Sequence, residues 1–159
     1  MEKKQRTLNN KGFSLIELIV VIAIMAILVG VLAPNVMRYV RQSRVSADTQ
    51  LADTIRTAVM TALADPGITD APAGTASFDL TSATAFDSNP GFGAAVATNL
   101  GYSSVANMAT GIAGEVKSMT ATSITVAIDG NARVSVTITD GGTNSITVPA
   151  PTTPAPTTP

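Results

Sequence analysis

Glu17 is the one side chain in the longest apolar segment of this sequence that carries a charge at neutral pH. The segment covers residues 13–33, and its only other polar side chain is that of Ser14. A carboxylate inside an apolar span costs about 2.5–3.5 kcal/mol on insertion scales, so such a residue is a functional candidate that needs a partner. Because nothing else in the segment is ionisable, we expect the partner of Glu17 to come from another chain or from a charge made by processing.

The remaining sequence offers little for catalysis. Its 159 residues include no Cys and no His, which excludes a thiolate nucleophile and a Cys-ligated metal, and removes the commonest general base. Three aspartates, Asp70, Asp79 and Asp87, are too widely spaced for an EF-hand calcium loop, so we interpret them as solvated surface acids. We therefore predict no catalytic site, no metal site and no cofactor, and we expect that the protein is not an enzyme.

The formal net charge of −1 is unevenly distributed. Residues 1–44 carry a net charge of +5 and residues 45–159 a net charge of −6. A nucleic-acid-binding protein would be more basic, with its charge spread over a folded face, so no nucleic-acid partner is indicated. The basic side chains instead flank the apolar segment on both sides.

The apolar segment is long enough to cross a bilayer, because about 20 apolar residues span a hydrocarbon core of roughly 30 Å. It has no polar face, unlike the core helix of a soluble domain, and it exceeds the 7–15 apolar residues of a secretory signal. The preceding basic residues, Lys3, Lys4, Arg6 and Lys11, should hold the N-terminus in the cytoplasm. Arg38, Arg41 and Arg44 follow the segment, and we interpret them as facing solvent or lipid headgroups, with subunit contacts as an open alternative.

The sequence KGFSLIE at residues 11–17, followed by the apolar run and Pro34, resembles the type IV pilin family, including the pseudopilins of type II secretion. The resemblance covers residues 1–40. It implies a leader peptide at residues 1–12, cleaved between Gly12 and Phe13 by prepilin peptidase, and N-methylation of Phe13. Glu17 and Pro34 then occupy the fifth and twenty-second mature positions, where the family typically has Glu and Pro.

The resemblance also implies partners and a location. The chain would be a single-pass protein of the cytoplasmic membrane before assembly, and part of an extracellular pilus afterwards. It would self-assemble into a helical filament with the help of the pilus assembly machinery. In such a filament the ammonium group of one Phe13 can lie near Glu17 of a neighbour, and pairing offsets most of the cost of burying either charge.

Gly30 and Pro34 weaken the helix where it leaves the apolar segment. Pro34 cannot donate to the carbonyl of Gly30 and clashes with it, at a cost of about 3 kcal/mol or more. The pair predicts either a simple kink or, by family analogy, a segment that unwinds when the filament stretches.

Beyond Pro34 the pattern predicts an amphipathic helix over residues 34–64, ended by Asp65-Pro66-Gly67. Its apolar stripe, which we expect to pack on a sheet, comprises Val36, Val40, Ala47, Leu51, Ile55, Ala58 and Ala62. Two ion pairs along the helix fit its spacing, Arg44 with Asp48 and Asp53 with Arg56.

The predicted head comprises a mixed helix and loop region at residues 65–121, an antiparallel sheet at residues 122–148 and a Pro/Thr-rich tail at residues 149–159. The first region should contain one short helix near residues 93–100, and the alternating segments 123–128, 133–139 and 145–148 predict strands. The fold class is α+β, a long N-terminal helix packed on a small antiparallel sheet, which is pilin-like by resemblance. Many pilins close their C-terminal region with a disulfide, so this Cys-free chain must hold its last loop by turns, packing or strand pairing.

We expect a structural subunit of a type IV pilus, assembled through its hydrophobic N-terminal helix. A pseudopilin of a secretion or competence system is the first alternative. The second is a single-span membrane-anchored protein that never polymerises.

Overall fold

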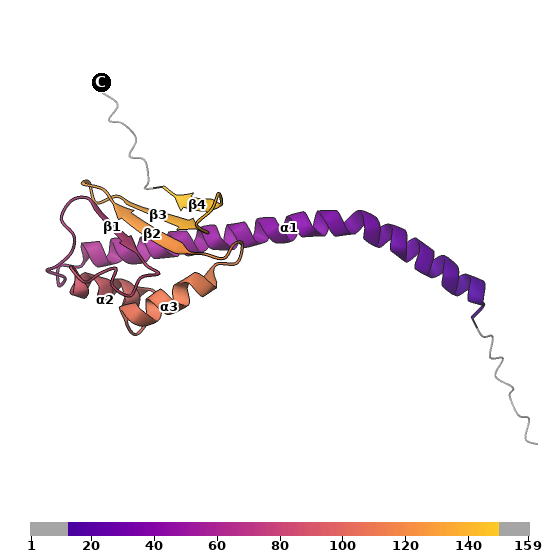
Figure 1. Ribbon diagram of the computed structural model, residues 1–159, viewed down its shortest axis with the longest axis horizontal. Helices are drawn as coiled ribbons and strands as arrows, with labels where there is room; N and C mark the ends of the chain where they lie inside the picture. Colours follow the sequence, from indigo (N-terminus) through magenta and orange to yellow (C-terminus); the bar gives the residue numbers. More distant parts are fainter. Residues whose placement is uncertain (1–12, 150–159) are drawn as a thin grey trace, which may run out of the picture. The chain divides into compact units, whose positions relative to one another are not determined.

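The computed structural model describes residues 13–149, and within them the chain forms one long helix followed by a small α+β head. The elements in chain order are α1 (Leu15–Ala64), β1 (Ala76–Asp79), α2 (Pro90–Asn99), α3 (Val105–Glu115), β2 (Ser123–Ile128), β3 (Val134–Thr139) and β4 (Ser145–Val148) (Figure 1). The predicted α+β class is confirmed. The chain divides into two compact units at Val40 and Arg41, and each is described by itself below.

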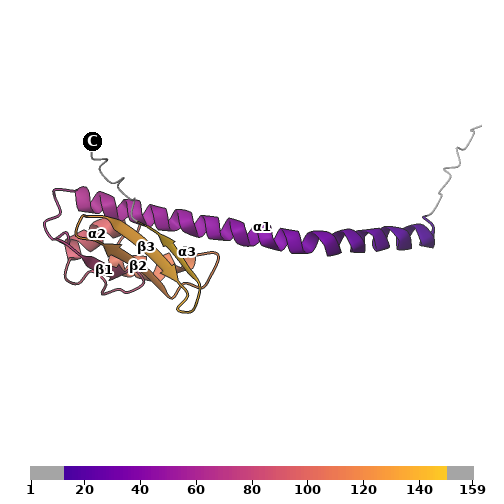
Figure 2. The ribbon, with the colours of Figure 1, turned by 90° about the horizontal axis from the view of Figure 1, so that it is seen from above.

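The four strands of the head form one antiparallel sheet in the order β1-β2-β3-β4 (Figure 1). Figure 2 shows β1, β2 and β3 of this sheet from above. Side chains alternate between its two faces, and β2 buries Ile124, Val126 and Ile128 on one of them. The β2–β3 turn is closed by Asp129, whose carboxylate accepts the backbone N–H groups of Asn131 and Arg133 at 2.9 Å. The three predicted strands are therefore confirmed to within one residue at each end.

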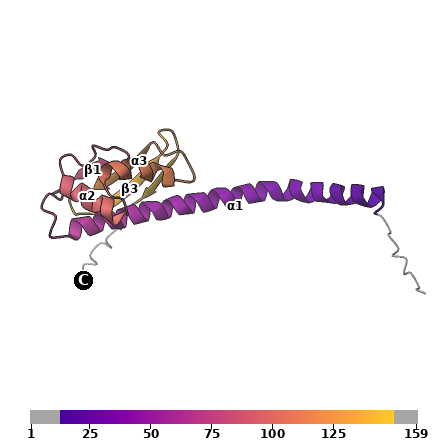
Figure 3. The ribbon, with the colours of Figure 1, turned by 90° about the horizontal axis from the view of Figure 1, so that it is seen from below.

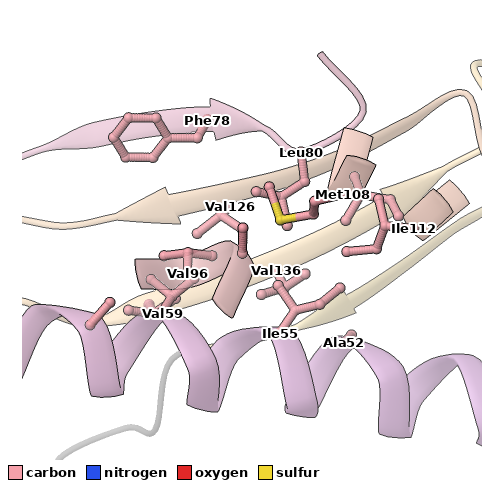
Figure 4. Close-up of a cluster of buried hydrophobic side chains, with 14 of the residues drawn as sticks. Ala52, Ile55, Val59, Phe78, Leu80, Val96, Met108, Ile112, Val126 and Val136 are labelled. Carbon is pink, nitrogen blue, oxygen red and sulfur yellow. The ribbon is translucent and has the colours of Figure 1, made fainter. Parts of the chain in front are cut away.

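The hydrophobic core lies on one face of the sheet, where three helices contribute side chains. Ile55 and Val59 come from α1, Val96 from α2, and Met108 and Ile112 from α3 (Figure 4). The helix α2 lies beside the C-terminal part of α1 (Figure 3), and its Asn99 Nδ2 donates to the carbonyl of Ala58 at 3.1 Å. An antiparallel sheet with one apolar face must pack that face against another element, and the second half of α1 is one of the helices that pack there.

The region 65–121 contains more regular structure than the sequence predicted. The expected short helix is present as α2, but β1 and α3 were missed. The strand β1 has four residues and buries one of them, Phe78, so its sequence pattern is weak; it is a strand because it pairs with β2, far along the chain. The helix α3 begins at a local signal that was overlooked, because the Ser104 side chain accepts the backbone N–H of Asn107 as an N-cap.

The predicted apolar stripe of the amphipathic helix is wrong in its first part. Val36, Val40 and Ala47 are exposed, and burial begins at Asp48 and continues through Ile55 to Ala62. The physical reason is that the head packs against α1 only from residue 48 onward. The apolar character of the earlier residues is therefore left without a partner in the described chain.

Among the described residues, Asp48 is the charged residue that is buried, with 1% of its surface exposed. Its two carboxylate oxygens accept the backbone N–H groups of Lys117 and Ser118, each at 2.7 Å. The predicted pair with Arg44 is therefore wrong, since Asp48 instead fastens the loop after α3 to the side of α1. The other predicted pair is confirmed, because Arg56 Nη2 lies 3.2 Å from Asp53 Oδ1.

The last loop of the head is held by hydrogen bonds, as expected for a chain without a disulfide. The Asp140 carboxylate accepts the backbone N–H of Gly142 at 2.8 Å and the side-chain amide of Asn144 at 2.6 Å. After this turn β4 pairs along β3, with Ser145 opposite Thr139 and Val148 opposite Val136. The rest of the predicted tail, residues 150–159, lies outside the described residues.

Candidate processing and assembly segment

Phe13 lies just before the first turn of α1, in non-helical backbone. Its side chain is 91% exposed, and α1 begins two residues later at Leu15. Gly12 and the predicted leader lie outside the described residues, so the cleavage site is described on its Phe13 side only. On that side the bond would be reached in non-helical chain, which an endopeptidase can bind in extended form.

Glu17 occupies the first turn of α1 and has a partner within its own chain. The backbone N–H of Ser14 donates to Glu17 Oε2 at 2.9 Å, while the carbonyl of Ser14 accepts the N–H of Glu17 at 3.1 Å. A carboxylate here also faces the positive end of the helix dipole, which stabilises it by about 0.3–1 kcal/mol at an exposed site. Glu17 therefore has a neutral hydrogen-bond partner within its own chain, and the expectation of a charged partner from another chain or from processing stays a prediction.

This contact had a signal in the sequence that was missed. Ser14 and Glu17 are spaced as S-x-x-E ahead of an apolar run, which is the pattern of a helix capping box. The carboxylate half of that motif is present here. Among the described residues Glu17 Oε1 has no hydrogen-bond partner, so one oxygen of the carboxylate stays available.

The surroundings of Glu17 are apolar. A shallow surface cavity of about 390 Å³ is lined by Glu17 with Phe13, Ile16, Val20 and Val21. One carboxylate thus lies among exposed apolar side chains, next to the residue that cleavage would leave at the N-terminus.

The rest of this unit is an unpartnered apolar helix. Every residue from 13 to 40 is exposed, including large side chains such as Leu15 (75%), Met25 (62%) and Ile27 (68%). By length and composition, α1 is the helix of the described chain that could cross a membrane. An apolar surface this large requires lipid or other protein to cover it.

Gly30 and Pro34 both lie inside α1, which continues through them. The side-chain amide of Asn35 donates to the carbonyl of Val31 at 3.4 Å, so this polar residue is partly satisfied within the helix. A Cβ atom at Gly30 would meet nothing within 4 Å, and packing within this chain does not require glycine there. The kink stays a prediction, as does unwinding.

Asp70 and Asp79 hold parts of the head together through hydrogen bonds to the backbone. Asp70 accepts the N–H groups of Gly91 at 2.7 Å and Phe92 at 2.9 Å, and thereby caps α2 from a distant loop. Burial tends to raise the pKa of Asp79, but hydrogen bonds from Thr81, Ser123 and Ile124 outweigh it and lower that pKa. Asp70 and Asp79 are thus half-buried and hydrogen-bonded to the backbone, so the interpretation as solvated acids holds only for the exposed Asp87. No group of three metal-binding side chains occurs in residues 13–149.

Comparison with known families gives one finding. Residues 7–33 match the family described as the prokaryotic N-terminal methylation motif, the class III signal peptide motif of type IV pilins. The match supports a precursor of the pilin or pseudopilin type that prepilin peptidase processes. No curated protein and no solved structure gave a significant match to the chain.

Proposed function

We propose that this protein is a structural subunit of a type IV pilus filament that polymerises through its hydrophobic N-terminal helix. The observation that carries the proposal is the coincidence of the methylation motif at residues 7–33 with an exposed apolar helix that begins beside Glu17. A motif of this kind supplies processing, and the apolar helix supplies a surface that only lipid or other subunits can cover.

Cleavage of the leader would create a positive charge that can pair with Glu17. Hydrolysis of the Gly12–Phe13 peptide bond leaves a carboxylate on Gly12 and an ammonium group on Phe13, and methylation then modifies that nitrogen. The new cation would lie close to its own Glu17, whose Oε2 already accepts the Ser14 N–H. In the filament Oε1 would accept the Phe13 ammonium of a neighbouring subunit.

An ion pair between the Phe13 ammonium and Glu17 of a neighbour would mainly fix the axial register of the subunits. Each charge is costly in an apolar bundle, and a neighbour in the wrong axial position leaves both unpaired. The pair therefore disfavours wrong stacking more than it adds stability, a use of buried polar groups known from coiled coils.

Prepilin peptidase, the pilus assembly machinery and neighbouring copies of the chain are the proposed partners. The chain would wait in the cytoplasmic membrane with α1 as its single span, and would leave the membrane on assembly to become part of a surface pilus. Its head residues would then form the outside of the filament.

Electron microscopy tests this proposal. Cells that express the chain together with its assembly machinery should carry long surface fibres that bind an antibody against the head. Short fibres that appear only on overexpression would favour a pseudopilin. Complete absence of fibres with the chain retained in the membrane would favour the single-span protein.

A further inference from the structure

The helix α1 changes its chemistry abruptly after Met37. Arg38, Arg41 and Arg44 recur at every third position, all three are exposed, and Tyr39 between them is 74% exposed. Within residues 13–149 none of these arginines forms an ion pair; the ion pair found there joins Arg56 to Asp53. Three guanidinium groups and one phenol thus follow the apolar helix without any partner in the described chain.

The apolar surface that precedes them is longer than the predicted span of residues 13–33. It continues through Val36 (55% exposed) and Met37 (74% exposed), and the intervening Asn35 donates its amide to the Val31 carbonyl. Residues 18–37 contain no ionisable side chain and extend about 30 Å as a helix, which equals the thickness of a bilayer core. Arg38 therefore begins where such a core would end.

We propose that Arg38, Tyr39, Arg41 and Arg44 form a phospholipid anchor that binds lipid phosphate groups on the non-cytoplasmic side of the membrane before assembly. The inference rests on the proposed function, because it requires α1 to span the bilayer. A guanidinium group matches a phosphate with two parallel hydrogen bonds, and tyrosine is enriched at the level of the headgroups.

The dimensions fit this partner. The headgroup region is about 5–8 Å thick on each side, and Arg41 and Arg44 lie about 4.5 and 9 Å beyond Arg38 along the helix axis. Long arginine side chains reach back toward the interface from such positions. All three guanidinium groups can therefore meet phosphate while Leu18 stays at the opposite boundary of the core.

The three arginines carry a cost that a contact with lipid would offset. Positive side chains on the non-cytoplasmic side weaken the orientation signal that the basic leader provides. A contact with lipid phosphate offsets this disadvantage and fixes how deeply the helix sits.

Spin-label depth measurements test the anchor, because a chain without Cys allows a single label at a chosen position. The full-length protein carries Val40→Cys, at an exposed position, and is reconstituted into phosphatidylglycerol vesicles. Accessibility of the label to oxygen and to a water-soluble nickel chelate then gives its depth. A second label at Met25→Cys reports whether the helix spans the bilayer at all.

With the arginines intact we expect the Val40 label at headgroup depth. Combining Arg38→Gln, Arg41→Gln and Arg44→Gln should move it about one helical turn, near 5 Å, into the hydrocarbon, because the basic leader then dominates the position of the helix. Replacing the same three residues with Lys should give a smaller shift, because lysine keeps the positive charge but cannot form the two parallel hydrogen bonds of a guanidinium group. Arg56→Gln is the matched control, and it should leave the depth unchanged because Arg56 is paired with Asp53.

An unchanged depth in the triple Gln variant would overturn the anchor and leave the proposed function intact. Unchanged depth with loss of filaments would likewise overturn it, and would assign the arginines to acidic surfaces of a second copy. A Met25 label that remains accessible to the nickel chelate would instead show that α1 does not span the bilayer, which contradicts the proposed function itself.

Discussion

The backbone N–H of Ser14 donates to the side chain of Glu17 at 2.9 Å, so the one carboxylate of the apolar segment is held at the start of α1 by its own chain. In the proposed filament, a carboxylate in this position would have two partners, namely its own helix end and the ammonium group of a neighbour. Its two oxygens allow both contacts at once.

The first prediction separates these two contacts. Glu17→Gln keeps an oxygen that can accept from Ser14 but loses the charge, whereas Glu17→Ala loses both. We expect both variants to insert into the membrane normally and to reduce filament yield at least tenfold or to block N-methylation, because the charge pair is missing. Fibre yield from sheared cells, with membrane content measured in parallel, checks this; normal yield from Glu17→Gln would refute the charge pair.

The second prediction concerns the buried Asp48. Asp48→Ala leaves the N–H groups of Lys117 and Ser118 without acceptors, which should lower the free energy of unfolding by about 2–4 kcal/mol. Asp48→Asn keeps one acceptor and should cost less. Thermal unfolding of the full chain in detergent measures the loss, and faster hydrogen exchange at these two amides would locate it.

A matched control for this experiment is Asp53→Ala. Asp53 forms an ion pair with Arg56 near the surface, where such pairs contribute about 0–1 kcal/mol. If both alanine variants destabilised the protein equally, Asp48 would not hold the loop as described.

A third prediction follows from the lowered pKa of Asp79. Burial acts to raise this pKa, but the hydrogen bonds of Thr81, Ser123 and Ile124 to the charged form lower it below the ordinary value of 3.8. Since the pKa is lower in the folded state, the contribution to stability is present above pH 3.8 and is lost as the pH falls through the folded value. Acid unfolding should therefore depend less steeply on pH in Asp79→Asn, and identical pH profiles would contradict this assignment.

The fourth prediction uses two glycines in helices of the head. A Cβ atom at Gly93 would lie 2.4 Å from Cβ of the buried Phe86, whereas one at Gly114 would meet nothing within 4 Å. Gly93→Ala should therefore destabilise the head by about 1–3 kcal/mol through overpacking. Gly114→Ala should be neutral or stabilise by up to about 1 kcal/mol, because alanine favours helix. Equal unfolding temperatures for the two variants would show that α2 does not pack on Phe86 this closely.

Most of the secondary structure could be predicted from local sequence patterns. The strands β2 and β3 alternate clearly between buried Ile and Val and outward Ser, Thr and Ala, so their ends could be predicted from sequence. The strand β1 could not, because its four residues become a strand only through pairing with β2. Where burial starts on α1 was equally hidden, since apolar side chains such as Val36 and Val40 look the same whether a sheet or a membrane covers them.

For the candidate site, the N-terminal motif could be predicted from the sequence, but the hydrogen bonds around it were missed. The methylation motif could be recognised from the sequence, and the family match covers residues 7–33. The individual roles of Gly12, Phe13, Glu17 and Pro34 rest on the resemblance and stay predictions. The Ser14 contact was missed because Glu17 was considered only as a charge, although its position in the first helical turn also makes it a cap. The role of Asp48 could not be predicted, since its partners come from a loop far along the chain.

Mass spectrometry of the N-terminal peptide of the protein, isolated from membranes of cells with an active prepilin peptidase, tests the central claim most directly. A Gly12→Leu variant, with a bulky residue before the bond, provides the uncleaved reference. We predict that the chain with Gly12 begins at Phe13 and that its terminal nitrogen carries a methyl group. A chain that still begins at Met1 would contradict the account, because neither the ammonium partner of Glu17 nor the filament could then form.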